Sequence, residues 1–145
     1  MLTGVFSGAY QSVADIKSAM GIAPLAGDDT EGLKICRRTN TSGTQAGHAQ
    51  LWVGSTYCGS PTKSASFVDA TFDDNNVANG FPVNYQVVEN SSSSNVENCV
   101  IAAADQGRSL GINSLENAPK PGAVDLKIDG ITASQQTAAQ GLYRW

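Results

Sequence analysis

The order of helical and strand-like segments along the chain constrains its fold more than any other sequence feature. Short apolar segments predict strands at residues 33–37, 83–88, 110–114 and 124–128. Apolar residues spaced three and four positions apart predict helices at residues 13–20, 43–53, 94–104 and 134–140. Helices that alternate with short strands are typical of layered α/β domains. We therefore expect an α/β fold.

Polar residues and glycines mark where several of these helices begin and end. Ser12 can cap the first helix, with Asp15 at its third position. Ser94 and Glu97 have the same spacing and predict a second capping box. Gly21 is a natural stop for the first helix, because glycine adopts the left-handed conformation that ends many helices.

Length and charge exclude several classes of function. The chain has 145 residues, which fits one domain, and a formal net charge of −4. A nucleic-acid surface needs a basic stripe that displaces counterions, so an acidic chain argues against one. One small anion can still bind, because local donors and dipoles govern a single site. We expect no cofactor, since no nucleotide-binding glycine motif is present. We also expect no membrane span, since no apolar run reaches roughly 18 residues.

The three cysteines, Cys36, Cys58 and Cys99, leave two interpretations open. They have no CxxC spacing and no histidine cluster beside them, which argues against a zinc site. In an exported protein, one disulfide between Cys58 and Cys99 with one thiol left over is the first interpretation. The second is that all three are small buried hydrophobic residues.

Residues 38–44, Arg-Thr-Asn-Thr-Ser-Gly-Thr, join a predicted strand to a predicted helix. The first backbone N–H groups of that helix, from Gly43 onward, have no acceptor within the helix, and they lie at the positive end of its dipole. Such a helix end is a ready anion site. Gly43 lets a ligand approach the backbone closely, and Ser42 and Thr44 add hydroxyl donors. Arg38 can offer a planar fork to two oxygens of a tetrahedral anion.

The same residues also allow a purely structural interpretation. Ser42 and Gln45 have the spacing of a capping box, and many helices begin this way without a ligand. An arginine beside a turn, such as Arg38, is usually a solvated surface group.

The segment Arg38-Thr39-Asn40-Thr41-Ser42-Gly43-Thr44 resembles the R-x-D-x-S-G-T motif of the phosphate-binding proteins of bacterial ABC transporters. Three other stretches fall in the order expected for that family and extend the resemblance over nearly the whole chain. They are Phe6-Ser7-Gly8, residues 110–117, and residues 128–131 together with Gly141-Leu142-Tyr143.

This resemblance implies a two-lobed clamshell, the type II periplasmic binding protein, of which residues 1–145 match only the second lobe. That lobe has a central mixed sheet flanked by helices, and the first lobe is absent. By the same resemblance Arg38, Ser42, Gly43 and Thr44 contact the anion. Asn40 replaces the aspartate that accepts a hydrogen bond from a protonated phosphate oxygen. An amide can also donate, so sulfate or another oxyanion is possible beside phosphate.

The implied function is that of a non-enzymatic receptor lobe that takes up phosphate or a related oxyanion. Its implied partners are the missing first lobe and the permease of an ABC transporter. The implied location is periplasmic or extracellular, as part of a longer exported protein, which would account for the missing signal peptide. An alternative is a structural or interaction domain that kept this fold without its ligand.

Two further sites are less favoured by the sequence. A hydrolase using Ser42 would need a base within hydrogen-bond reach, and His48 lies six residues further on, well around the helix. His48 is therefore interpreted as a structural histidine. The acidic pairs Asp28-Asp29 and Asp73-Asp74 lack the ligand spacing of an EF-hand, so we interpret them as solvated loop charges.

Overall fold

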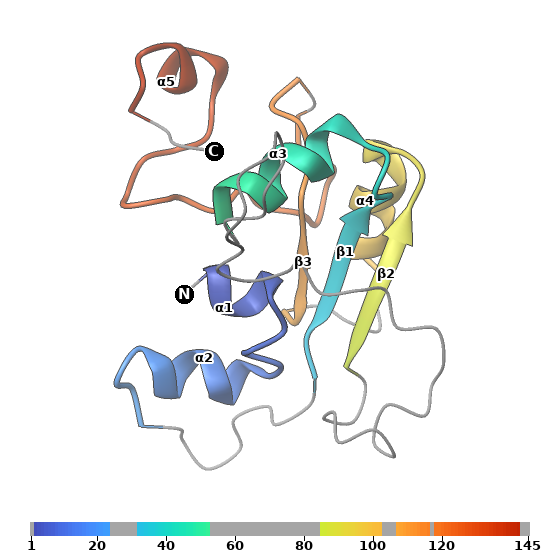
Figure 1. Cartoon of the computed structure of the whole chain (residues 1–145). Coiled ribbons are helices and arrows are strands. Elements are labelled where there is room, and N and C mark those ends of the chain that lie inside the picture. The colour runs from blue at the N-terminus through green and yellow to red at the C-terminus, as the bar shows by residue number, and fades with distance from the viewer. Residues whose placement is uncertain (1, 24–31, 53–84, 103–106, 117, 143–145) are drawn as a thin grey trace, which may run out of the picture.

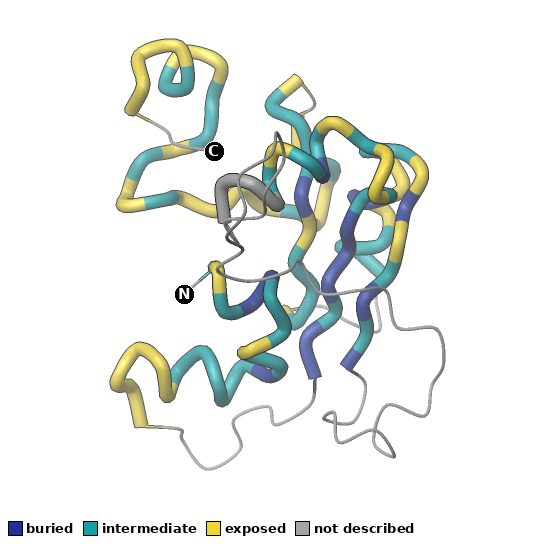
Figure 2. The backbone as a smooth tube through the Cα atoms, viewed as in Figure 1, coloured by how far each residue is buried: buried dark blue, intermediate teal, exposed yellow. Residues whose placement is uncertain are grey.

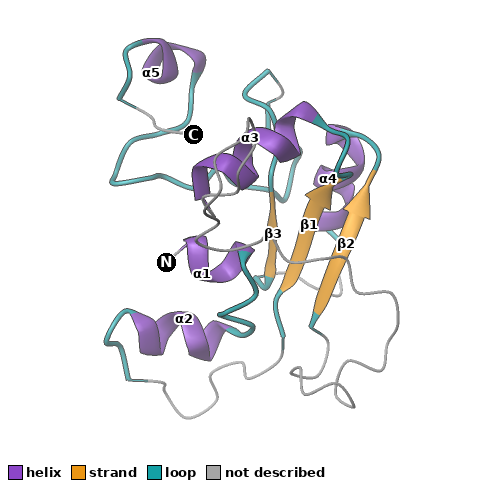
Figure 3. Ribbon diagram, viewed as in Figure 1, coloured by secondary structure: helices purple, strands orange, loops and turns teal. Residues whose placement is uncertain are grey.

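The computed structural model describes residues 2–23, 32–52, 85–102, 107–116 and 118–142 (Figure 1). Its helices are α1 (Leu2–Phe6), α2 (Val13–Ala19), α3 (Gly43–Trp52), α4 (Ser93–Val100) and α5 (Gln135–Ala139). Its strands are β1 (Lys34–Arg38), β2 (Gln86–Asn90) and β3 (Ser109–Gly111). Figure 3 shows these elements by type. The predicted α/β class is confirmed.

The three described strands form one parallel sheet in the order β2-β1-β3. Lys34 pairs with Gln86 and with Ser109, so β1 is the central strand. The sequence resemblance implied a mixed sheet, whereas both pairings between the described strands are parallel. The predicted strand at 124–128 is wrong, because residues 124–127 pair with no described strand.

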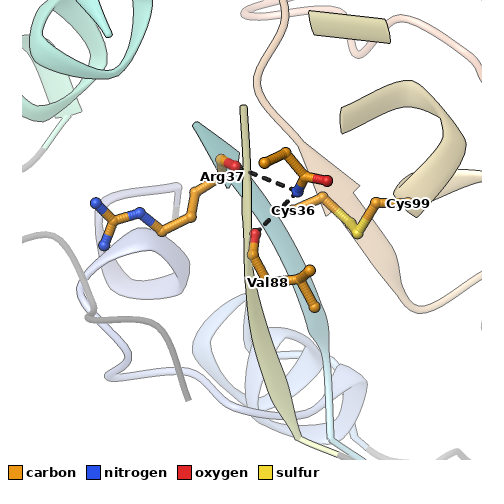
Figure 4. Close-up of a disulfide and its surroundings, with 5 residues drawn as sticks. Cys36, Arg37, Val88 and Cys99 are labelled. Carbon is orange, nitrogen blue, oxygen red and sulfur yellow. Dashed lines mark hydrogen bonds between the residues drawn. A yellow bond between two sulfur atoms is a disulfide. The ribbon is translucent and has the colours of Figure 1, made fainter. Parts of the chain in front are cut away.

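Among the described helices, one covers one face of this sheet and two lie against the other. The helix α4 packs on one face, and α1 and α3 lie against the other (Figure 1). Side chains of β1 alternate between the faces, as the pleat of a strand requires. Cys36 therefore points toward α4, while Ile35 and Arg37 point toward α1 and α3. Figure 4 shows Cys36 and Arg37 on opposite sides of the strand.

The hydrophobic core lies on the α1 side of the sheet. Its members are seven buried residues drawn from α1, from β1 and β2, and from positions flanking the strands: Val5, Phe6, Leu33, Ile35, Tyr85, Val87 and Ile112. Val13 and Ile16 of α2 pack against this cluster and remain partly exposed. Figure 2 shows that burial follows β1 and the start of β2. The core thus fixes β1, whose carboxyl end leads into the motif at 38–44, beside its neighbour β2.

On the other face of the sheet, a disulfide joins β1 to α4. It joins Cys36 on β1 to Cys99 on α4, with 6.0 Å between the Cα atoms (Figure 4). The suggested pairing of Cys58 with Cys99 is wrong, as is the alternative of three unpaired cysteines. The reason is topological: α4 packs directly over the central strand, which brings Cys99 to Cys36. Cys58 lies outside the described residues.

Local capping explains the first turns of α2 and α4. In α2 the predicted box is confirmed, since Ser12 Oγ accepts from Asp15 N and a carboxylate oxygen of Asp15 accepts from Ser12 N. The cap of α4 is Ser92, whose Oγ accepts from Asn95 N at 3.1 Å. The predicted box of Ser94 with Glu97 is therefore wrong.

Glu97 is buried and serves a different purpose. Its Oε1 accepts a hydrogen bond from Asn113 Nδ2 at 2.9 Å, and its Oε2 lies 3.7 Å from Lys120 Nζ. Lys120 Nζ also donates to Ser94 Oγ and to Asn98 Oδ1. These contacts dock residues 118–122 on α4.

Residues 123–142 form a C-terminal arm that leaves the rest of the molecule (Figure 1). None of these residues is buried. Ile128 and Ile131 exchange two backbone hydrogen bonds around a turn in which Asp129 and Gly130 have positive φ. The predicted helix at 134–140 is confirmed as α5, with Ser134 as its cap. Among the described helices none is long and apolar enough to cross a bilayer.

Candidate functional site

The motif at 38–44 lies at the carboxyl edge of the sheet, where β1 and β2 end side by side. Both strands point the same way, and Arg38 is in register with Asn90. The chain then leaves β1 toward α3 on one face and leaves β2 toward α4 on the other (Figure 1). Ligands of open α/β sheets bind in the crevice outside the carboxyl ends of the strands, and this is the edge where the motif lies.

Arg38 links the end of β1 to the residues that follow β2. Its Nε donates to Asn90 O at 3.3 Å, and its Nη2 donates to Ser91 O at 2.9 Å. Its Nη1 donates to Ser93 Oγ at 3.2 Å. The guanidinium therefore ties the end of β1 to the first turn of α4. A guanidinium has five N–H donors, so one N–H on each terminal nitrogen is left over beyond these contacts with the described residues.

The first turn of α3 is open to solvent. Gly43 is exposed, and an added Cβ there would meet no atom within 4 Å. Neither the Gly43 N–H nor the Thr44 N–H donates to an acceptor among the described residues. Ser42 Oγ accepts from Gln45 N at the long distance of 3.5 Å. The helix end is thus weakly capped by its own chain and keeps unpaired amide donors.

The capping box suggested by Ser42 and Gln45 is only half formed. Gln45 Oε1 accepts from Arg38 N at 3.1 Å, and Ser42 N donates to Thr39 O instead. Gln45 is 1% exposed, and its Nε2 has no hydrogen-bond partner among the described residues. The glutamine side chain therefore links α3 to the end of β1 rather than completing a cap.

The side chain of Asn40 contacts Arg37. Arg37 is buried on the α1 side of the sheet, and its Nη2 donates to Asn40 Oδ1. The amide oxygen of Asn40 is thus in contact with a cation, whereas its nitrogen is left as a potential donor. An amide in this place suits an anion that carries no proton to share.

Asn90 is a site residue that the sequence motif did not reveal. It is 9% exposed, and its Nδ2 donates to Arg37 O at 3.3 Å and to Val88 O at 3.0 Å (Figure 4). Its own carbonyl accepts from Thr39 N. Asn90 thereby joins the ends of β1 and β2. Its position at the end of a predicted strand, followed by a serine run, was the signal that could have found it.

The surface beside this crevice is a shallow groove of about 650 Å³. It runs along β2 and α4, and polar side chains dominate its wall. The lining residues are Lys34, Thr39, Val88, Glu89, Asn90, Ser91, Asn95, Asn98 and Cys99. Arg38, Ser42, Gly43 and Thr44 are not among them.

His48 lies one turn further along α3 and is partly buried. Burial lowers the pKa of His48 to about 4, so the imidazole is neutral at pH 7. Its Nδ1 has no hydrogen-bond partner among the described residues, and no hydrogen bond joins it to Ser42 Oγ. The described part of the chain also holds no group of three His, Cys, Asp or Glu side chains that could bind a metal ion.

No family model, curated protein or solved structure matches this chain. What the crevice can bind is therefore inferred from its own geometry. Two helix N-termini, one guanidinium and several hydroxyl groups lie at one sheet edge, and all of them stabilise negative charge. Asp28-Asp29 and Asp73-Asp74 lie outside the described residues.

Proposed function

We propose that this chain is a receptor lobe that binds phosphate or a related tetrahedral oxyanion between the first turns of α3 and α4. The observation that carries the proposal is the exposed first turn of α3 at Gly43, which follows the carboxyl end of β1 beside that of β2. In this site the N–H groups of Gly43 and Thr44 donate to the anion. Arg38 supplies the positive charge, while its remaining contacts hold the two loops at a fixed distance.

The identity of Asn40 bears on which oxyanion is preferred. A carboxylate in its place would accept from a protonated oxyanion and would repel a fully ionised one. The uncharged Asn40 amide does not repel an ionised oxyanion, it can donate as well as accept, and its oxygen already contacts Arg37. We therefore expect sulfate and phosphate to bind with similar affinity.

The proposed biological setting is uptake by an ABC transporter. A first lobe would close over the anion from the other side, and the permease would receive it. The Cys36–Cys99 disulfide supports an exported protein in the periplasm or outside the cell, because disulfides persist in oxidising compartments. We propose no catalytic step for Ser42, because its Oγ lacks a base among the described residues.

A matched pair of substitutions at Gly43 tests the binding site. Both Gly43→Asp and Gly43→Asn place a side chain of the same size where Cβ meets open space, so both variants fold. A negative charge at a helix N-terminus stabilises the helix, yet it repels a bound anion. In calorimetric titrations with phosphate and sulfate we expect Gly43→Asn to bind more weakly than the native chain and Gly43→Asp not to bind.

Arg38→Ala is a less selective test. It would remove the anion's guanidinium and also the hydrogen bonds to Asn90, Ser91 and Ser93 that shape the crevice. The Gly43 pair is therefore the deciding experiment. Equal affinities of Gly43→Asp and Gly43→Asn for sulfate would show that the anion does not bind at this helix end.

A second candidate function is a structural or interaction domain that retains this fold without an anion. It is favoured by the acceptors that Arg38 already has within the chain and by the pairing of Asn40 with Arg37. The same titration separates the two functions. A native chain that binds neither phosphate nor sulfate at millimolar concentration would favour this second function.

A further inference from the structure

The start of the C-terminal arm presents an unpaired backbone edge. Residues 124–127 make no backbone hydrogen bond with any described residue. They follow Gly122, where the chain leaves α4, and in Figure 1 the backbone of this segment has an extended course. An exposed extended segment of this kind is a template for pairing with another strand.

The side chains of this segment alternate strictly between apolar and charged. Val124 is 84% exposed and Leu126 is 50% exposed, and Ile128 follows at the same spacing. Asp125 and Lys127 occupy the positions between them and are also exposed. In an extended conformation one face is therefore apolar and the other carries one negative and one positive charge. No described element covers the apolar face.

Antiparallel pairing of two copies, centred on Leu126, places apolar side chains opposite apolar ones on one face and opposite charges together on the other. It places Val124 opposite Ile128 of the second copy, and Leu126 opposite Leu126. On the charged face it places each Asp125 opposite a Lys127. Opposite charges directly across a strand pair attract, and like charges repel.

Other alignments of the same two segments place like charges opposite each other or apolar side chains opposite charged ones. Parallel in-register pairing places Asp125 on Asp125 and Lys127 on Lys127. Antiparallel alignments centred on Asp125 or Lys127 also oppose like charges. A shift by one residue brings apolar side chains against charged ones. The alignment centred on Leu126 is thus specified by the sequence of the segment itself.

The turn between Ile128 and Ile131 uses one edge of the segment and leaves the other edge available for pairing with a second copy. Ile128 directs its N–H and C=O to Ile131, so that edge of the segment is occupied. In a strand, neighbouring residues direct these groups to opposite edges. Asp125 and Lys127 therefore present theirs at the other edge, where each Asp125–Lys127 pair can exchange two hydrogen bonds.

We propose that residues 124–128 bind the same residues of a second copy of this chain as an antiparallel two-stranded ribbon centred on Leu126. The segment is short, and an isolated two-stranded ribbon is marginally stable in water. The dimer is therefore reversible and depends on protein concentration.

Two charge reversals test the register. Asp125→Lys and Lys127→Asp each turn both cross-strand ion pairs into like-charge pairs, so we expect each variant to weaken the dimer about tenfold or more. An equimolar mixture of the two variants places lysines opposite aspartates and should regain the native affinity. The measurement is sedimentation velocity of the full chain over a range of concentrations at low salt.

Glu116→Lys is the matched control, because it makes the same charge change at an exposed position outside the segment. We expect it to leave the dimer unchanged. Circular dichroism and thermal melting of the variants should match the native chain, since the arm has no buried residue. A native chain that stays monomeric at every concentration overturns the proposal. So does a mixture of the two variants that associates no better than either one alone.

Discussion

The chain up to residue 122, which we call the body, and the C-terminal arm use the same local signals but differ in burial. Both regions contain a helix that begins with a capping box, Ser12 with Asp15 in the body and Ser134 with Thr137 in the arm. The body packs its helix against a buried core, whereas no residue of the arm is buried. Local signals thus determine where a helix begins. Burial determines how much the packing of that helix contributes to the free energy of unfolding.

The two regions should therefore respond differently to substitution. Changes in the body should alter the free energy of unfolding of the domain. Changes in the arm should alter only local opening or the association of two copies. The following experiments test this difference, from the largest expected effect to the smallest.

The largest effect is expected from the disulfide. Cys36 and Cys99 are 63 residues apart in sequence, so their bond restricts a long loop in the unfolded chain. The chain-entropy model gives about 4 kcal/mol for a loop of this length. We expect Cys36→Ala with Cys99→Ala to lower the free energy of unfolding by about that amount, measured by urea denaturation. Reductant should have no further effect on this variant, and an unchanged midpoint in the absence of reductant would contradict the account.

A pair of glycines provides the next comparison within the body. A Cβ added at Gly32 would collide with the backbone of Tyr85, while one added at Gly47 of α3 would meet nothing within 4 Å. We expect Gly32→Ala to cost about 3 kcal/mol through overpacking. Gly47→Ala should stabilise the domain by up to about 1 kcal/mol through helix propensity. Thermal melting of both variants checks these values, and two equal shifts would show that Gly32 is not held against Tyr85.

The buried imidazole makes stability depend on pH. The pKa of His48 is about 4 in the folded chain, and it returns to its ordinary value of 6.5 on unfolding. The unfolded chain then binds the proton more tightly, so stability should fall as the pH drops below about 6.5 and through the folded pKa. Linkage gives a loss of about 2 kcal/mol between about pH 7 and pH 5. In His48→Gln this part of the pH dependence should disappear, and if both chains respond alike, His48 is not buried.

The smallest effect on global stability is expected from the cap of α5. Ser134→Ala removes the acceptor for Thr137 N and should destabilise α5 locally by about 1 kcal/mol. Because α5 contains no buried residue, the melting temperature of the domain should not change. Ser12→Ala, the matched change in the body, should lower that temperature. Hydrogen exchange of the α5 amides, compared with thermal melting, separates the local effect from the global one. A lower melting temperature for Ser134→Ala would show that the arm is part of the core.

The sequence predicted the elements whose signals are local. The cap at Ser12, the stop at Gly21, the strand that became β1 and the helix beginning at Gly43 are all confirmed. Each depends on neighbouring residues alone, so periodicity and capping chemistry were sufficient. The short helix α1 was not predicted, because five residues are too few to show a helical period.

The errors have causes that no local pattern contains. The pairing of Cys36 with Cys99 depends on α4 crossing over β1, and the parallel order of the strands depends on the whole topology. Residues 124–128 have the alternation of a strand, but no described strand pairs with residues 124–127. Ser94 and Glu97 have capping spacing, but Asn113 and Lys120 engage Glu97 instead. In each case a tertiary partner, or the lack of one, overrode the local signal.

The site was found only in part for the same reason. The motif at 38–44 is contiguous, so its residues could be chosen from sequence. Asn90 and Ser93 lie more than 50 positions away and come to Arg38 only through the pairing of β1 with β2. The role of Arg38 as a tie between two loops could not be seen without that pairing.

An amide chemical-shift titration of the full chain with sulfate and phosphate tests the proposed crevice most directly. If the anion binds between α3 and α4, the amide resonances of Gly43, Thr44 and Ser93 should move together and saturate at one shared dissociation constant. Resonances in the arm, such as that of Ala138, should stay in place. Shifts that rise linearly without saturation, or that leave Gly43 unmoved while other amides respond, would contradict an oxyanion site at this edge of the sheet.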